Sequence, residues 1–420
     1  MSKFKKLVKL WRYLLLLFII AIFLNSCTAD SLPLQTQKLQ GNILILLPLN
    51  DDSNAMITTA LQEFKRLNPD VNIIIEYNQK EHLLQRFIQE SKKGLGATAI
   101  IDFSRQIPEL AKSGNIRPIP ESSIDISRYF ASMLTQVRYQ GKIYGVPLAS
   151  HTRILCYNQA KLQISQDPIL SQPPTKLDGL IERARQGYSV GMVSSFEDTL
   201  WGMGTFGSSF IDDKGYIDPQ LEGWSKWLEW LKNAAIQPNF VLVREKRDIL
   251  HQAFAEGRLT YYVCNSNEIP NLRKTLHDNL KVALLPGDSF PASPLLYTRV
   301  MMFNQSASPN EMNIGLALAK FLTNAEQQIY GMVVTQSYIP SNRHISLDMG
   351  LLPIQLVLLQ QAKTVVAIPL DDLGILTPVL KQAELLYQQA IAGEISTTEA
   401  AQKLTVFIRS QISQPSEEYR

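Results

Sequence analysis

Through the first quarter of the chain, apolar runs of strand length alternate with segments whose apolar residues recur at helical spacing. The run NILILLPL (42–49) is continuous and of strand length, which is typical of a strand covered on both faces, and VNIIIEY (71–77) and TAIID (98–102) predict a second and a third strand. Between these runs, residues 57–67 and 83–88 carry apolar side chains at helical spacing. The order strand, helix, strand, helix, strand, with short connections, predicts right-handed crossovers and a parallel sheet.

The rest of the chain changes pattern. Short alternating pieces predict an extended run over 143–157, and a helix then precedes a buried strand at 188–193. The segment LEGWSKWLEWLKNAA (221–235) places tryptophans and leucines on one helical face, which predicts core packing. Two further strands, KVALLPG (281–287) and YTRVMMFN (297–304), precede a series of amphipathic helices.

The N-terminus has the pattern of a secretion signal. A basic head is followed by an apolar body over 13–24, which is short for a membrane span of about 20 residues. The sequence LNSC at 24–27 resembles the lipobox of bacterial lipoproteins, with Cys27 as the lipidated first residue of the mature chain. We therefore expect a signal peptide at 1–26 and a tether at 27–41. An uncleaved signal anchor, or a plain secretion signal with an incidental cysteine, are the alternatives.

Composition restricts the possible classes. Removing the signal leaves roughly 390 residues, more than one hydrophobic core usually serves, so two lobes are expected. Hydrophobic residues make up 45% and charged residues 19%, as in a globular chain. The net charge of +3 comes partly from the leader, and no basic stripe indicates nucleic acid. Cys156 and Cys264 each lie in an apolar strand-like run; a disulfide is possible, but two buried free thiols are favoured.

Signatures of enzymes are missing from the sequence. Its 5 histidines include no pair at zinc-ligand spacing, so no metal site is expected. No Gly-rich phosphate loop follows the first strand, and there is no G-x-S-x-G elbow. We expect neither a cofactor nor catalysis. A lipid-anchored hydrolase would need a nucleophile and base pair that the sequence does not show.

Several motifs, taken in order, resemble the extracellular solute-binding proteins of ATP-driven importers, the group that includes the maltose-binding proteins. They are ALQEFKRLNPDVNIIIEY, GKIYGVPLASHTRILCYNQAKL, AFAEGRLTYYVCNS and SASPNEMNIGLALAKFLTNAEQQ, and the resemblance covers residues 42–412. Two departures are visible: Ala97-Thr98 stands where the family usually writes Pro-Asp, and LLYTRVMMFNQ lacks the common Gly-rich start. The fold tolerates both departures, but a relative's ligand does not transfer.

The resemblance implies an α/β, two-lobed periplasmic-binding-protein fold (type II), each lobe a central sheet flanked by helices. Three crossings would join the lobes, so that each lobe is discontinuous in sequence. The N-terminal lobe would comprise 42–148 and 267–337, and the C-terminal lobe 149–266 and 338–420. A small solute would bind in the cleft of a monomer anchored at the periplasmic or extracytoplasmic face of a membrane. An ABC permease with its ATPase subunits would receive the solute.

Candidate binding residues come from two arguments. In open parallel sheets, ligands bind beyond the carboxyl ends of the strands, which marks 50–53 and 102–105. The family pattern adds positions on the opposite lobe, near the crossings and after the strand GMV. Together these arguments select Asp51, Asp52, Asp102, Phe103, Arg105, His151, Thr152, Thr199, Trp201, Asn265 and Tyr297.

The sequence leaves more than one ligand class open. Phe103, Trp201 and Tyr297 would cover the apolar face of a sugar, while carboxylates and amides would bind its hydroxyls, so a sugar or oligosaccharide is favoured. The converging aspartates would also suit a cationic polyamine. A ligand-sensing lipoprotein on the same fold is a further alternative. His151 fits a hinge hydrogen bond as well as a ligand contact.

Overall fold

The computed structural model describes residues 38–49, 54–162, 170–211, 221–244, 246–346, 348, 350 and 352–413. The chain divides into Met1–Leu39 and Gln40–Arg420, and the description below concerns the second unit. The predicted leader with Cys27, and the candidate residues Asp51 and Asp52, lie outside the described residues. Within the described part, no helix is long and apolar enough to cross a membrane.

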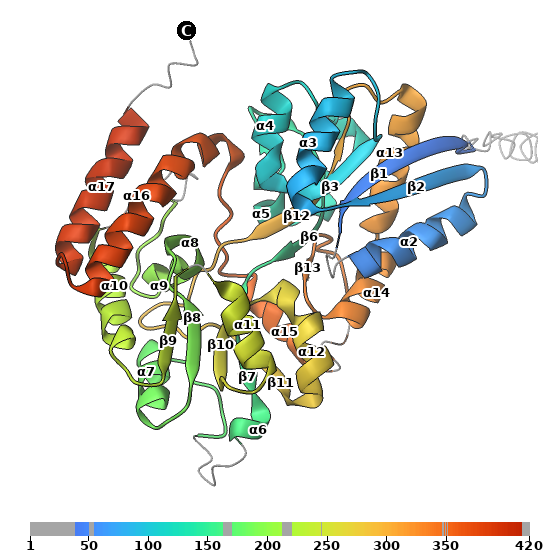
Figure 1. The fold of residues 1–420 in the computed structure, drawn as a ribbon. Helices are drawn as coiled ribbons and strands as arrows, with labels where there is room; N and C mark the ends of the chain where they lie inside the picture. The colour runs from blue at the N-terminus through green and yellow to red at the C-terminus, as the bar shows by residue number, and fades with distance from the viewer. Residues whose placement is uncertain are drawn as a thin grey trace, which may run out of the picture. The chain divides into compact units, whose positions relative to one another are not determined.

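A six-stranded sheet forms the first lobe (Figure 1), with the order β13-β6-β12-β3-β1-β2. Its strands are β1 (Gly41–Pro48), β2 (Val71–Asn78), β3 (Ala99–Phe103), β6 (Val146–His151), β12 (Tyr297–Phe303) and β13 (Ile339–Pro340). Strand β1 pairs in parallel with both β2 and β3, which confirms the predicted parallel arrangement. Strand β12 runs antiparallel between β3 and β6, so its first residue lies at the edge where β3 ends.

A five-stranded sheet forms the second lobe, with the order β11-β7-β10-β8-β9. Its strands are β7 (Arg153–Asn158), β8 (Val190–Val193), β9 (Phe240–Val243), β10 (Tyr261–Asn265) and β11 (Leu280–Ala283). Strands β10, β8 and β9 are parallel, whereas β7 is antiparallel to β10. The carboxyl ends of three parallel strands therefore lie together, as they do in the first lobe.

Helices flank both sheets (Figure 1). The first-lobe helices are α2 (Asn54–Leu67), α3 (Lys80–Ser91), α4 (Ile107–Lys112), α5 (Ala131–Thr135), α13 (Pro309–Leu322) and α14 (Ala325–Thr335). The second-lobe helices are α6 (Gln159–Leu162), α7 (Leu177–Arg185), α8 (Phe196–Thr199), α9 (Trp201–Gly204), α10 (Leu221–Ala235), α11 (Arg247–Ala255), α12 (Ile269–Leu276), α15 (Pro353–Gln361), α16 (Leu373–Ala392) and α17 (Thr397–Ser413). Short elements that matter below are η1 (Ser104–Gln106), β4 (Arg138–Tyr139), β5 (Lys142–Ile143), η4 (Ser266–Glu268) and η7 (Leu370–Asp372).

The tryptophan helix α10 packs as its sequence predicts. Trp224 and Trp227 are fully buried in a cluster that α16 and α17 complete. The Trp224 ring stacks on Phe196 with ring centroids 4.8 Å apart, and the Trp227 and Trp230 rings stack at 5.0 Å. Figure 1 shows α10 beside the two C-terminal helices, which lie next to each other at the end of the described chain. The helices of the tail therefore belong to the core of the second lobe.

The second crossing lies later in the chain than predicted. The strand expected at 281–287 was assigned to the first lobe, but β11 pairs with β7 in the second sheet, with Leu280 opposite Asn158. Segment 267–283 is therefore part of the second lobe, and the chain crosses between Ala283 and Tyr297. An apolar run of strand length fits the edge of either sheet, and the pattern alone does not show which edge is open. The first crossing, at Thr152 between β6 and β7, lies close to the predicted position.

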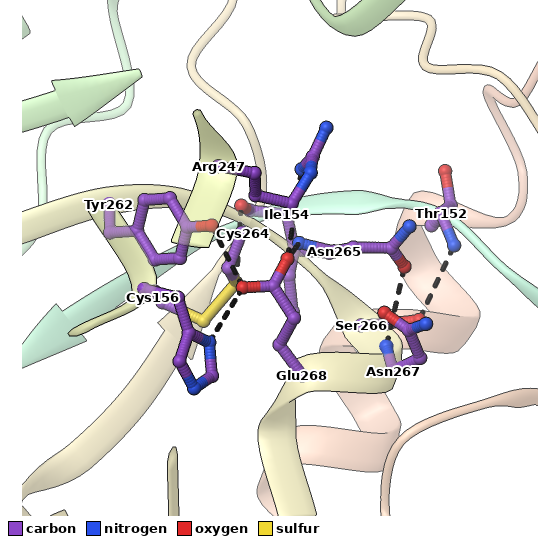
Figure 2. Close-up of a disulfide and its surroundings, with 11 residues drawn as sticks. Thr152, Ile154, Cys156, Arg247, Tyr262, Cys264, Asn265, Ser266, Asn267 and Glu268 are labelled. Carbon is purple, nitrogen blue, oxygen red and sulfur yellow. Dashed lines mark hydrogen bonds and ion pairs between the residues drawn. A yellow bond between two sulfur atoms is a disulfide. The ribbon is translucent and has the colours of Figure 1, made fainter. Parts of the chain in front are cut away.

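The preference for free thiols is wrong. Cys156 and Cys264 form a disulfide between β7 and β10, with their Cα atoms 5.8 Å apart (Figure 2). On these neighbouring antiparallel strands Cys264 lies opposite Ile154, and Cys156 lies opposite Tyr262. The two cysteines are 108 residues apart in sequence. Only knowledge of the strand order would have shown that they share one face of one sheet.

Candidate functional site

A cavity of about 290 Å³ opens where residues of both lobes meet. The first lobe supplies residues at the end of β3, in η1 and near β4, together with the start of β12. The second lobe supplies residues of α8, of the connection before β12 and of the segment 368–380. The lining consists of Phe103, Ser104, Arg105, Gln106, Gln136, Glu197, Leu200, Leu295, Leu296, Tyr297, Thr298, Ile368, Leu370, Leu373, Leu376, Thr377 and Leu380.

The end of β3 supplies one wall, as the strand-end rule predicts. Phe103 is half-buried and lines the cavity, and the guanidinium of Arg105 lies 5.7 Å from the centroid of its ring. Asp102 does not line the cavity. Its carboxylate is buried, and Oδ1 accepts a hydrogen bond from the Phe103 backbone N–H at 2.7 Å. The predicted aspartate therefore holds the loop that presents Phe103 and Arg105.

Tyr297 and Glu197 meet across the boundary between the lobes. Tyr297 begins β12, while Glu197 lies in α8, just after β8. The Tyr297 hydroxyl donates a hydrogen bond to Glu197 Oε1 at 3.1 Å, and both residues line the cavity. Burial raises the pKa of the Tyr297 hydroxyl, and the Glu197 carboxylate raises it further. Tyr297 therefore remains a protonated donor at any physiological pH.

A buried charged network supports this wall from the second lobe. Arg153 forms an ion pair with Asp198, which also pairs with Arg247. The Arg153 guanidinium lies 5.6 Å from the centroid of the Tyr297 ring. Burial alone would raise the pKa of Asp198, but Arg153 and Arg247 outweigh burial and hold that pKa below its ordinary value. Asp198 is therefore ionised, and its ion pair holds the Arg153 guanidinium next to the Tyr297 ring.

Glu268 is the second carboxylate of this network. It accepts hydrogen bonds from the Tyr262 hydroxyl at 2.8 Å and from the Asn265 N–H at 2.9 Å, and it lies 2.9 Å from His251 Nδ1 (Figure 2). Burial opposes ionisation, but the His251 contact, Arg247 and the other donors lower the pKa of Glu268.

Among the described residues, no group of three or more His, Cys, Asp or Glu side chains is arranged to hold a metal ion.

His151 and Thr152 lie in the crossing and not in the cavity wall. Nδ1 of His151 is 3.2 Å from the Ser337 carbonyl oxygen and 3.4 Å from Ser266 Oγ. Thr152 donates its hydroxyl to the Leu295 carbonyl at 2.9 Å. Both side chains are buried. They join the segments that run between the lobes, which is the hinge role that the sequence left open for His151.

The structure contradicts a stacking role for Trp201 at the cavity. Only 1% of Trp201 is exposed, and its ring packs on Trp227 with centroids 5.1 Å apart. The neighbouring Gly202 explains the Gly-rich segment, because a Cβ there would lie 2.3 Å from the Trp227 ring. Thr199 is also buried, and its hydroxyl donates to the Ser195 carbonyl at 2.9 Å. Asn265 caps η4 together with Glu268. None of the three predicted residues lines the cavity.

Sequence reasoning missed the largest part of the lining, which is aliphatic. Leu373, Leu376, Thr377 and Leu380 follow one another on a single face of α16 and line the cavity. The sequence gives no separate signal for these residues, because the apolar positions of α16 also serve its packing against α8, α10 and α17. The pattern predicts amphipathic helices in this part of the chain and selects none of these four residues as binding candidates.

Comparisons with known proteins agree with this architecture. The family model described as bacterial extracellular solute-binding protein matches residues 59–349. The maltodextrin-binding protein MdxE of Bacillus subtilis is 22% identical over 255 residues, which cover 57% of this chain and 58% of that relative. The match therefore spans little more than half the length of that relative.

Solved structures show the same fold. The GacH receptor of Streptomyces glaucescens, solved unliganded and with acarbose, has a TM-score of 0.73 at 16% identity, covering 90% of this chain and 99% of that one. The maltose-maltodextrin binding protein of Alicyclobacillus acidocaldarius has a TM-score of 0.71 at 16% identity, covering 88% and 100%. The two-lobed α/β fold is shared with both. The chain belongs to the family of bacterial extracellular solute-binding proteins, which bind solutes outside the cytoplasm and are not enzymes.

Proposed function

We propose that this protein is the lipid-anchored substrate-binding component of an ABC importer, and that it captures a sugar or oligosaccharide between its lobes for delivery to a permease. The observation that carries the proposal is the cavity of about 290 Å³ with walls from both lobes. A solute in that space contacts both walls only when they are close together. Binding therefore favours the closed arrangement, which a permease would recognise.

Features of the lining support a neutral, hydroxylated ligand. The rings of Phe103 and Tyr297 offer apolar surfaces to a pyranose, Glu197 accepts hydrogen bonds, and Gln136 both donates and accepts them. One relative named as a maltodextrin-binding protein, and a structural neighbour solved with maltotetraose, support the same class.

A cationic polyamine is less well supported by the described lining. Among the described residues that line the cavity, Glu197 is the one carboxylate, and the guanidinium of Arg105 offsets its charge. Transport is preferred to sensing because the family serves solute capture, although both uses share the same binding site. The membrane anchor rests on the LNSC motif at Cys27.

Titration calorimetry on the mature chain without its leader tests the proposal. Maltose, maltotriose and maltotetraose are titrated beside spermidine and glutamate. We expect heat from at least one sugar, and a Tm that rises with sugar concentration because binding stabilises the folded state by about 2.7 kcal/mol at 100 Kd. Glu197→Gln should weaken that binding. Glu222→Gln, on the exposed face of α10, is the matched control and should not. Saturable binding of spermidine with no response to any sugar would reject the sugar assignment.

A further inference from the structure

The cavity has two chemically different sides. Of the 17 described residues that line the cavity, eight are leucine or isoleucine: Leu200, Leu295, Leu296, Ile368, Leu370, Leu373, Leu376 and Leu380. Every one of them comes from the second lobe or from the connection that leads out of it. The first lobe contributes instead Ser104, Arg105, Gln106 and Gln136, with the Phe103 ring. The lining from the first lobe is therefore mainly polar, and the lining from the second lobe is mainly aliphatic apart from Glu197 and Thr377.

Five of these eight residues, from Ile368 to Leu380, come from one continuous segment. Residues 368–372 lead into α16, whose first two turns present Leu373, Leu376 and Leu380 at helical spacing. Leu373 and Leu380 are only partly buried by the protein, so part of their surface remains available to a ligand. The segment is held at both ends. Asp371 accepts the Gln140 N–H at 2.8 Å, and Glu384 accepts the Phe196 N–H at 2.8 Å.

A sugar alone makes favourable contacts only with the polar side of the cavity. A pyranose carries hydroxyls around its rim, and a hydroxyl placed against leucine side chains loses its bonds to water without gaining new partners. An alkyl or aryl group placed there gains affinity by leaving water. The volume of about 290 Å³ lies at the small end of ligand pockets, which hold about 300–1,000 Å³. One sugar ring with a short apolar substituent matches both the chemistry and the size.

We propose that the natural ligand is a glycoside whose sugar contacts Glu197, Tyr297 and the first-lobe residues while an apolar aglycone lies against the leucines of α16. This inference rests on the proposed function, because it assumes a sugar in the cavity. It adds that the polar sugar and the apolar aglycone both contribute to the binding affinity. Unsubstituted sugars then bind weakly.

Calorimetry with a graded series tests the inference. The probes are glucose, methyl, butyl and hexyl glucoside in both anomers, phenyl glucoside, maltose, maltotriose and hexanol, all below micelle-forming concentrations. Each buried methylene should strengthen binding by about fourfold, so hexyl glucoside should bind at least tenfold more tightly than methyl glucoside. Binding should show a negative heat-capacity change that grows with the chain.

The outcomes separate the two proposals. If maltose or maltotriose binds as tightly as the hexyl and phenyl glucosides, the sugar-binding function stands and the aglycone inference falls. If hexanol binds as tightly as hexyl glucoside, the polar head contributes nothing and the inference also falls. If no sugar and no glycoside in the series binds, the proposed function itself is contradicted.

A pair of variants on the same helix locates the aglycone. Leu380→Gln should weaken hexyl glucoside binding tenfold or more while changing methyl glucoside binding less than twofold. Leu385→Gln, on the face of α16 that is 50% exposed, should change neither. Equal losses for both glucosides, or no loss, would overturn the assignment. If Leu380→Gln does not fold, Leu373→Gln in the first turn takes its place, with the same expected results.

Discussion

Tyr297 hydrogen-bonds Glu197 over 3.1 Å and thereby joins the first residue of β12 to a short helix of the other lobe. The bond lies in the cavity wall, and the Arg153 guanidinium faces the Tyr297 ring from behind. A ligand that enters the cavity meets an oriented hydroxyl and an oriented carboxylate. The site is therefore preorganised at its polar end.

Removing the Tyr297 hydroxyl should weaken ligand binding. Tyr297→Phe keeps the ring but deletes a hydrogen bond of about 0.5–1.5 kcal/mol, which corresponds to roughly two- to tenfold in Kd. Calorimetry with the best sugar or glycoside measures the change. Tyr330→Phe, at a hydroxyl-bearing residue that is 45% exposed on α14, is the control. An unchanged Kd in Tyr297→Phe would show that this wall does not contact the ligand.

The pairing of Asp198 with arginines predicts loss of stability in acid. Its pKa is lower in the folded state than in the unfolded state. The unfolded chain therefore takes up the proton first as pH falls below about 4, and the contribution of Asp198 declines from there. Asp198→Asn should remove that part of the acid dependence. It should also cost about 3–5 kcal/mol near neutral pH, because Arg153 is left buried without its partner. Urea unfolding between pH 3 and 7 measures both effects, and parallel pH profiles for the variant and the parent would contradict the assignment.

The disulfide predicts sensitivity to reductant. Closing a loop of 108 residues removes entropy from the unfolded chain, and the expected stabilisation is about 2–5 kcal/mol. Reduction, or the double change Cys156→Ala with Cys264→Ala, should lower the urea midpoint accordingly. The double variant should then no longer respond to reductant. Detection of two free thiols in the oxidised, denatured mature chain would contradict the bond.

Trp201 should contribute to stability more than to binding. Trp201→Ala removes a buried ring from the core of the second lobe, and such changes cost about 3–5 kcal/mol. Urea unfolding gives the loss, and calorimetry below the transition gives the affinity. A variant with unchanged stability and much weaker ligand binding would restore the stacking role that the sequence suggested.

Lipid attachment at Cys27 is tested in cells. Cys27→Ala should release the protein from membranes or leave it with an uncut leader, because the thiol that accepts the lipid is gone. Fractionation followed by mass measurement of the N-terminus distinguishes the two results. If the variant remains on the membrane and is cleaved at the same bond as the parent, another feature anchors it.

Local patterns predicted more of the fold than of the site. Continuous apolar runs and helical spacings identified β1, β2 and β3 and the buried face of α10, because these features repeat within a few residues. They did not show that β11 joins the second sheet or that Cys156 meets Cys264, because both facts depend on strand order. The strand-end rule located Phe103 and Arg105 but also selected Asp102, whose carboxylate turns to its own backbone. In the sequence the leucines of α16 look like ordinary core positions, because only the structure shows the cavity beside them.

The hydrogen bond between Asp371 and Gln140 has a consequence for how the cleft opens. Asp371 belongs to the segment that leads into α16, whereas Gln140 belongs to the turn between β4 and β5 in the first lobe. Gln140 adopts a left-handed backbone with φ of 48°, so the turn has a defined shape. Parting the lobes must either break this bond or draw residues 368–372 along with the first lobe. In the second case Ile368 and Leu370 would stay beside the first-lobe wall while Glu197 moves away with the second lobe.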